Sequence, residues 1–107
     1  MSTSEFRWNK RRKHFSYIFK TVGNLRLNII LTTKPYRMVH GKEKRNIRLT
    51  KHPNPNSDKD AYVIPYVYLD DLNVFHDRVY DWNFNINDKR IIKRIKKQFH
   101  INKKSQP

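Results

Sequence analysis

Two runs of alternating residues, separated by a glycine and an asparagine, restrict the fold of this chain more than any other feature of its sequence. Residues 15–20 place Phe15, Tyr17 and Phe19 on one side, and residues 25–31 alternate again before ending in Ile-Ile-Leu. Alternation with a period of two is typical of β-strands, and Gly-Asn between two such runs favours a tight antiparallel turn. We therefore predict a β-hairpin over residues 15–31.

A second clear pattern lies near the C-terminal end of the sequence. Its apolar positions, which recur with helical spacing, are Ile91, Ile92, Ile95 and Phe99. Asn87 is a favourable N-cap and Asp88 falls in the first turn, while the many cations that follow suit the negative end of a helix dipole. We predict an amphipathic helix that begins after Asn87 and frays after His100.

The segments between the hairpin and this helix have weaker patterns. Residues 34–46 are polar and basic, which predicts a long mobile loop, and residues 52–58 are rich in Pro and Asn, which predicts a second loop. Short strands are expected at residues 47–49, 61–68 and 72–75, with Pro65 placing the second of them at an edge or a bulge and Asp70-Asp71 forming a turn.

These elements predict an α+β fold, in which a small, strongly bent antiparallel β-sheet or barrel is closed by one C-terminal α-helix. A length of 107 residues fits a single domain. We expect residues 1–14 to form a basic N-terminal arm, residues 15–100 to form the domain, and residues 101–107 to form a frayed tail.

The chain is strongly basic, and its charge is unevenly distributed. It has 24 Lys and Arg against 9 Asp and Glu, a formal net charge of +15. Six Asp gather in residues 58–82, whereas residues 1–57 contain two acids and residues 89–107 contain none. Basic faces on a folded body are typical of proteins that bind nucleic acid. We expect RNA or DNA as the partner, with an anionic membrane or an acidic protein as alternatives.

The composition argues against several classes of chemistry. The sequence has no Cys, which excludes disulfides and thiolate sites, and its two Gly do not make a glycine-rich phosphate loop. The five His lack the spacing of a zinc site, and the Asp residues lie in turn-like surroundings, so we expect no metal and no cofactor. No apolar run approaches the ~18 residues of a membrane span, and we expect a soluble, cytoplasmic protein.

Basic residues on three segments are candidates for contacts with nucleic-acid phosphates. They lie before the first strand, after the second strand and on the C-terminal helix. These candidates are Lys10, Arg11, Lys13, Lys34, Arg37, Lys89, Arg90, Lys93, Arg94 and Lys97. Three tyrosines, Tyr62, Tyr66 and Tyr68, share one face of their predicted strand and are candidates for base stacking. The alternative is a solvated basic surface over an aromatic core.

Two residues beside the predicted hairpin suggest chemistry. His14 follows a run of cations at the start of the first strand, and nearby positive charge favours the neutral imidazole that a general base requires. Thr32 ends the second strand, where a hydroxyl close to an Arg is suited to hold a reacting phosphate. The alternatives are a His at the rim and an ordinary strand-end Thr, neither with a chemical role.

Several short motifs follow one another in a recognisable order. A basic stretch, Lys-Arg-Arg-Lys-His-Phe at 10–15, leads into the first strand, and the second ends in Ile-Ile-Leu-Thr-Thr at 29–33. Ile-Arg-Leu at 47–49 precedes a loop, Ala-Tyr-Val at 61–63 begins a later strand, and a segment of Asn, Asp and Ile spans 86–95. This order resembles the PemK/MazF-like toxin endoribonucleases and their ToxN-type relatives.

The resemblance implies an SH3-like barrel that cleaves single-stranded RNA without a metal, with the 2′-hydroxyl as nucleophile. It implies that Arg12 or Arg11, together with Thr32, holds and protonates the reacting phosphate. The Arg-Pro dipeptide of the family is missing, and His14 lies near its place. The resemblance also implies an acidic antitoxin as a protein partner, and a homodimer.

Two other functions fit the same sequence. One is a non-catalytic nucleic-acid-binding accessory protein of a phage, plasmid or mobile element. The other is an inhibitor that occupies a nucleic-acid-binding protein or its nucleic acid. Both would keep the basic faces and lack the chemistry of His14 and Thr32.

Overall fold

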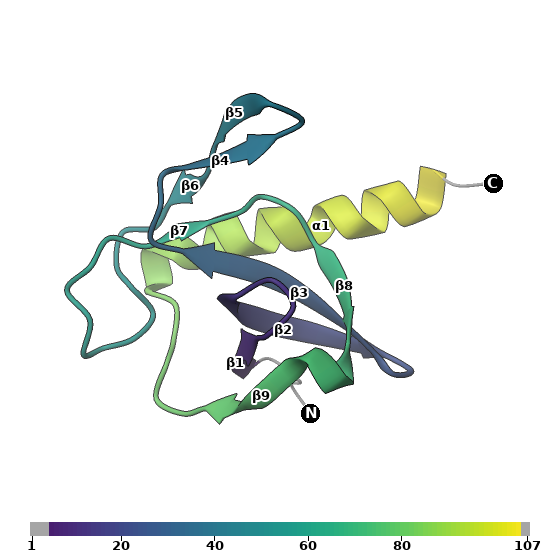
Figure 1. Ribbon diagram of the computed structural model, residues 1–107, viewed down its shortest axis with the longest axis horizontal. Helices are drawn as coiled ribbons and strands as arrows, with labels where there is room; N and C mark the ends of the chain where they lie inside the picture. Colours follow the sequence, from purple (N-terminus) through teal and green to yellow (C-terminus); the bar gives the residue numbers. More distant parts are fainter. Residues whose placement is uncertain (1–4, 106–107) are drawn as a thin grey trace.

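The computed structural model describes residues 5–105, which form an α+β fold as predicted (Figure 1). The elements in chain order are β1 (Glu5–Asn9), β2 (His14–Val22), β3 (Leu25–Thr32), β4 (Tyr36–Val39), β5 (Lys42–Arg45), β6 (Ile47–Arg48), β7 (Tyr62–Val63), β8 (Tyr68–Asp71), the 3-10 turn η1 (Leu72–Val74), β9 (Phe75–Val79), the 3-10 turn η2 (Ile86–Asp88) and α1 (Lys89–Ser105). Within this range all strand pairs are antiparallel. No helix in it has the length and apolar character needed to cross a lipid bilayer.

The predicted hairpin is confirmed as β2 and β3, which are joined by Gly23 and Asn24. Gly23 has a φ of +60°, and it is the first of the two turn residues. A glycine at that position suits the two-residue turns whose twist matches antiparallel strands. β3 becomes the central strand of the fold, and its residues 27–32 are all buried.

The main sheet is strongly curled, which its connectivity explains. Its strand order is β6-β7-β3-β2-β1-β9, and β8 pairs with the first half of β3. In a flat sheet β8 and β9 would lie four strand spacings apart, about 19 Å. The link from Asp71 to Phe75 through η1 spans at most about 14 Å even when extended. The sheet must therefore roll until its edges approach, as a small barrel does.

The helix α1 packs on this sheet and completes the core. Ile92 and Ile95 are buried in one cluster with Phe6, Ile29 and Phe84, and Figure 1 shows α1 passing behind the strands. The predicted N-cap at Asn87 is wrong. Asn85 is the capping residue, because its side chain accepts a hydrogen bond from the Asn87 N–H and starts η2 before the α-helix begins.

The predicted N-terminal arm is wrong for residues 5–9, which form β1 between β2 and β9. Phe6 points into the core, where it is 4% exposed. β1 has only two apolar residues, Phe6 and Trp8, so its alternation is too short for a strong strand signal. Residues 1–4 of the predicted arm lie outside the described part of the chain.

The predicted mobile loop at 34–46 is also wrong, because β4 and β5 form a hairpin there. The two turn residues, His40 and Gly41, both have positive φ, +51° and +77°. Such a pair matches the turn that closes tight hairpins. The hairpin projects from the rest of the molecule (Figure 1), and its strands lack the apolar alternation that marks a half-buried strand.

Three local predictions near the end of the chain require correction. Asp70 and Asp71 belong to β8 and do not form a turn, because they pair with Arg26 and Leu25 of β3. Residues 72–74 form η1 in place of a strand, since the Asp71 side chain accepts a hydrogen bond from the Asn73 N–H. The predicted frayed tail is helical through residue 105, and residues 106–107 lie outside the described range.

Candidate functional site

His14 and Thr32 lie at the same end of the central hairpin. β2 begins at His14 and β3 ends at Thr32, and Ser16 pairs with Ile30. Beyond this pair, His14 pairs with Asn9 of β1 and Thr32 pairs with Tyr62 of β7. The first residue of one strand and the last of the next therefore lie at the open end of the hairpin. Both of them border the same two cavities.

The first of these, here the strand-end cavity, has a volume of about 190 Å³. Its lining residues are Trp8, Lys13, His14, Phe15, Leu31, Thr32, Thr33, His52 and Trp82. Two histidines, a lysine and two threonines thus border one small cavity with aromatic walls. The loop of His52 is tied to the segment of Trp82, because the Asn83 N–H donates to the Pro53 carbonyl at 3.0 Å.

The second, here the hairpin cavity, has a volume of about 400 Å³ and lies against the β4–β5 hairpin. Its lining residues are His14, Thr32, Lys34, Tyr36, Arg37, Met38, Glu43, Asn46 and Ile64. Arg37 is held in place by hydrogen bonds to the Arg45 carbonyl at 2.9 Å and to the Asn46 side chain at 2.7 Å. His14 and Thr32 therefore separate two cavities, each with its own cations.

The two histidines of the strand-end cavity favour their neutral forms. Burial lowers the pKa of His14 below its ordinary value, and the charge of Lys34 lowers it further. Burial likewise lowers the pKa of His52, with a contribution from Lys59. His52 Nδ1 accepts a hydrogen bond from the Asn54 N–H at 3.0 Å. The neutral His52 ring therefore has its hydrogen on Nε2, where it is a donor.

Thr32 is oriented by the turn that follows it. Its Oγ1 accepts a hydrogen bond from the Lys34 N–H at 3.1 Å, and the residue is only 9% exposed. A hydroxyl that accepts one hydrogen bond still has its own hydrogen to donate. Thr32 is therefore set up as a donor to an anion in either cavity.

Arg12 and Arg11, the other predicted catalytic residues, lie against a buried carboxylate. Arg12 forms two hydrogen bonds of 2.9 Å with Asp70, and Arg11 Nη1 lies 3.7 Å from the same carboxylate. The Asp70 side chain is 0% exposed and also accepts hydrogen bonds from Asn9 and Asn28. The Arg12 guanidinium lies 4.2 Å from the centre of the Tyr68 ring.

This network lowers the pKa of the Asp70 carboxyl. Burial alone would raise that pKa, but hydrogen bonds from Arg12, Asn28 and Asn9 and the positive charge of Arg12 outweigh burial. Arg12 and Asp70 thus compensate each other's charge. Arg11 and Arg12 lie against Asp70 and are not among the residues that border the strand-end or hairpin cavity.

The predicted phosphate-binding residues fall into three groups. Lys13 borders the strand-end cavity, and Lys34 and Arg37 border the hairpin cavity. Lys89 and Lys93 border a third cavity, between α1 and the sheet. The remaining predicted residues, which border none of these three cavities, are Lys10, Arg11, Arg90, Arg94 and Lys97.

Sequence reasoning missed His52 and Trp82 as site residues. They are 20 and 50 positions beyond Thr32, in segments that look like ordinary loops. His52 precedes the Pro-Asn-Pro turn, which is the only local signal that its backbone is held. Of the tyrosines predicted to stack on bases, Tyr66 and Tyr68 lie under the guanidinium groups of Arg37 and Arg12.

Among the described residues, no group of three or more His, Asp or Glu lies close enough together to hold a metal ion. Comparison with known proteins found no matching family model, no matching curated protein and no matching solved structure. The function of the site therefore has to be argued from its own chemistry.

Proposed function

We propose that this protein is a metal-independent endoribonuclease that cleaves single-stranded RNA by attack of a 2′-hydroxyl on the adjacent phosphate. The observation that supports this proposal is that His14 and Thr32 both border the same two cavities, one of which is also bordered by Lys13 and the other by Lys34 and Arg37. A phosphate at this junction would have one nucleotide on each side.

His14 acts as the general base in this proposal. Its lowered pKa keeps the imidazole neutral at pH 7, and a neutral imidazole takes the proton from the 2′-hydroxyl. The 2′-oxygen then bonds to phosphorus while the bond from phosphorus to the 5′-oxygen breaks. The products are a 2′,3′-cyclic phosphate and a new 5′-hydroxyl.

The neighbouring groups stabilise the charge that develops on the phosphate. Thr32 donates its hydroxyl hydrogen to a non-bridging oxygen, and His52 donates from Nε2. Lys13 supplies positive charge and the proton for the leaving 5′-oxygen. Lys13 has a φ of +59°, a conformation uncommon for a residue with a side chain and one that occurs at functional sites.

The experiment is incubation of the purified chain with mixed-sequence single-stranded RNA in EDTA, followed by a denaturing gel. We expect discrete cuts whose 5′ fragments end in a cyclic phosphate. His14→Ala and Thr32→Ala should each slow cleavage by roughly 10²-fold, the scale of losing one transition-state contact. The matched controls are His76→Ala and Thr21→Ala, because His76 and Thr21 are exposed residues outside both cavities.

A non-catalytic RNA-binding protein is the second candidate, and one observation favours it. Arg11 and Arg12, to which the resemblance assigns phosphate chemistry, are both paired with Asp70. Such a protein would shift RNA on a native gel and leave it intact in EDTA. An acidic antitoxin or other acidic protein remains a proposed partner, because the net charge of +15 attracts one.

A further inference from the structure

A third cavity, which neither His14 nor Thr32 borders, lies between α1 and the sheet. It has a volume of about 580 Å³ and is called the helix groove here. Three lysines border it from the helix, at positions 89, 93 and 96, and Arg78 borders it from β9. Spacings of four and three residues place Lys89, Lys93 and Lys96 along one side of the helix.

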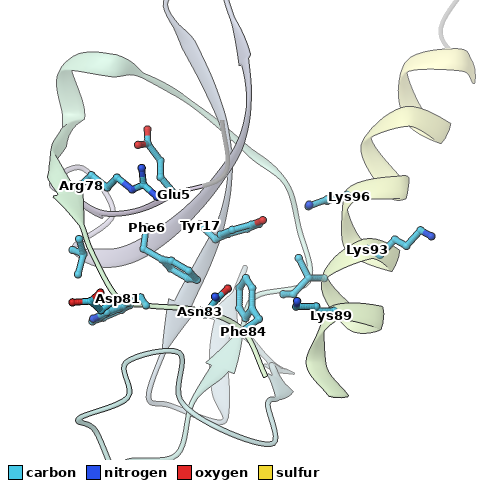
Figure 2. A pocket seen from close by; sticks show the side chains of 13 residues that line it. Glu5, Phe6, Tyr17, Arg78, Asp81, Asn83, Phe84, Lys89, Lys93 and Lys96 are labelled. Carbon is cyan, nitrogen blue, oxygen red and sulfur yellow. The ribbon is translucent and has the colours of Figure 1, made fainter. Parts of the chain in front are cut away.

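Aromatic side chains form the opposite side of the helix groove. Phe6 lies with its ring centre 5.1 Å from those of both Tyr17 and Phe84, and Tyr17 lies 4.8 Å from Phe84. Lys96 Nζ is 5.2 Å from the centre of the Tyr17 ring. Figure 2 shows Lys89 and Lys96 reaching from the helix toward these rings.

The charge of the helix groove favours an anionic ligand. Its four cations face two carboxylates, Glu5 and Asp81. Glu5 is already paired with Arg7, at 3.0 Å. Proteins commonly bind single-stranded nucleic acid with cations beside partly exposed aromatic rings, because the cations bind phosphates and the bases stack on the rings.

Trp82 connects this groove to the proposed cleavage site. It borders both the helix groove and the strand-end cavity. Its ring lies 5.7 Å from Phe6 in the groove, and 4.6 Å and 5.5 Å from Phe15 and His52 in the cavity. Trp82 therefore lies between the strand-end cavity and the helix groove.

We propose that the helix groove binds the continuation of the single-stranded RNA substrate, with phosphates on Lys89, Lys93 and Lys96 and a base against Tyr17 or Trp82. This inference rests on the proposed function for the direction of the strand. It defines the substrate as a strand several nucleotides long, in which the residues at the cut are joined to a second binding segment.

The test uses the full chain with His14→Ala, so that RNA is bound without being cut. Fluorescent oligoribonucleotides of two, four, six and eight residues are titrated at constant salt, and anisotropy gives Kd. We expect affinity to rise at least about tenfold from the shortest to the longest, because stacking of one base contributes ~1–3 kcal/mol. The variant with Lys89→Gln, Lys93→Gln and Lys96→Gln should lose this gain and bind the dinucleotide as before.

The matched control removes the same charge from the rest of the helix, with Arg90→Gln, Arg94→Gln and Lys97→Gln. If affinity still rises with RNA length in the control but no longer does so in the lysine variant, the result supports RNA binding in the helix groove. An equal loss in both variants would mean that the helix attracts RNA through net charge alone, and it would overturn the groove. The proposal is also overturned if poly-glutamate binds the groove while RNA shows no length gain, which would identify an acidic polypeptide as the ligand.

Failure of the groove is distinguishable from failure of the proposed function. If the wild-type chain cuts RNA but its affinity does not rise with RNA length through the groove lysines, the ribonuclease proposal stands and the groove proposal is wrong. If the chain binds long RNA through the three lysines but does not cut it, the groove proposal stands and the ribonuclease proposal is wrong.

Discussion

The carboxylate of Asp88 accepts a hydrogen bond of 2.9 Å from the backbone N–H of Thr50, and a second one from Lys51. Asp88 is completely buried at the start of the helix, and Thr50 lies two residues before His52. The start of α1 thus fixes the loop that brings His52 to the strand-end cavity. The position of a proposed site residue depends on a carboxylate on a different element.

We expect Asp88→Ala to destabilise the fold by about 1–3 kcal/mol, the scale of the hydrogen bonds that this buried carboxylate accepts. The change should be visible as a lower midpoint in urea unfolding. Asp58→Ala is the control, because Asp58 is exposed and surface substitutions change stability by less than ~0.5 kcal/mol. Equal midpoints for the two variants would show that Asp88 does not anchor the loop.

Asp70→Asn should be more damaging, with a loss of about 3 kcal/mol, since it leaves the Arg12 guanidinium without its buried partner. Arg12→Lys should also be less stable than the wild type, because an ammonium does not make the two parallel hydrogen bonds of a guanidinium. Urea unfolding of both variants checks this. The exposed Asp77→Asn serves as the control, and a wild-type midpoint for Asp70→Asn would contradict the role given to the network.

The same pair predicts how stability changes in acid. The pKa of Asp70 is lowered in the folded protein, so the unfolded chain takes up its proton first as the pH falls. The stabilisation that ionised Asp70 gives the fold is fully present above about pH 4, the ordinary pKa of Asp in an unfolded chain. It is lost as the pH falls through the lower pKa of Asp70 in the folded protein. Urea unfolding from pH 6 to pH 2 should show this loss, and it should be smaller in Asp70→Asn.

The rate of RNA cleavage should fall at low pH as His14 becomes protonated. Because burial and the charge of Lys34 lower the pKa of His14, kcat/KM should begin to fall at a lower pH than it would with an ordinary His. Lys34→Gln removes a nearby charge that lowers this pKa, so kcat/KM should begin to fall at a higher pH than in the wild type. Burial still keeps the pKa of His14 below its ordinary value in this variant. The control is Lys42→Gln, at an exposed position of β5, which should leave the pH dependence of kcat/KM unchanged.

Gly41→Val tests the contribution of the β4–β5 hairpin. Gly41 has a φ of +77°, where a β-branched side chain is strained by roughly 1–2 kcal/mol. We expect faster amide exchange in residues 36–45 and weaker RNA binding, with the main sheet unchanged because the hairpin forms a separate sheet. Slow exchange of the hairpin amides in the variant would show that the turn is not what holds the strands together.

Patterns of strong periodicity predicted the fold well. Phe15 to Leu31 and Ile91 to Ile95 carry regular apolar spacing, and the sequence therefore located the central hairpin and the helix. β1 was missed because it has only two apolar residues, and the β4–β5 hairpin was missed because its exposed strands and His-Gly turn give no strong hydrophobic alternation.

The candidate site was predictable in part. His14 and Thr32 were found because each lies at the end of a strong strand, and the structure places both at the same two cavities. Sequence spacing could not show that Asp70 would lie against Arg12, 58 positions away. It also could not place His52 and Trp82, whose positions depend on Asp88 and on the Asn83–Pro53 hydrogen bond.

The order of the main sheet also determines how this protein meets other copies of itself. Its edge strands are β6, which is two residues long, β8, which is four residues long and ends in two Asp, and β9, where His76, Asp77 and Arg78 form an exposed polar row. Short strands and charged edges discourage the addition of another strand. At high concentration the chain should therefore resist edge-to-edge aggregation, and the homodimer that the resemblance implies would have to form through a face of the molecule.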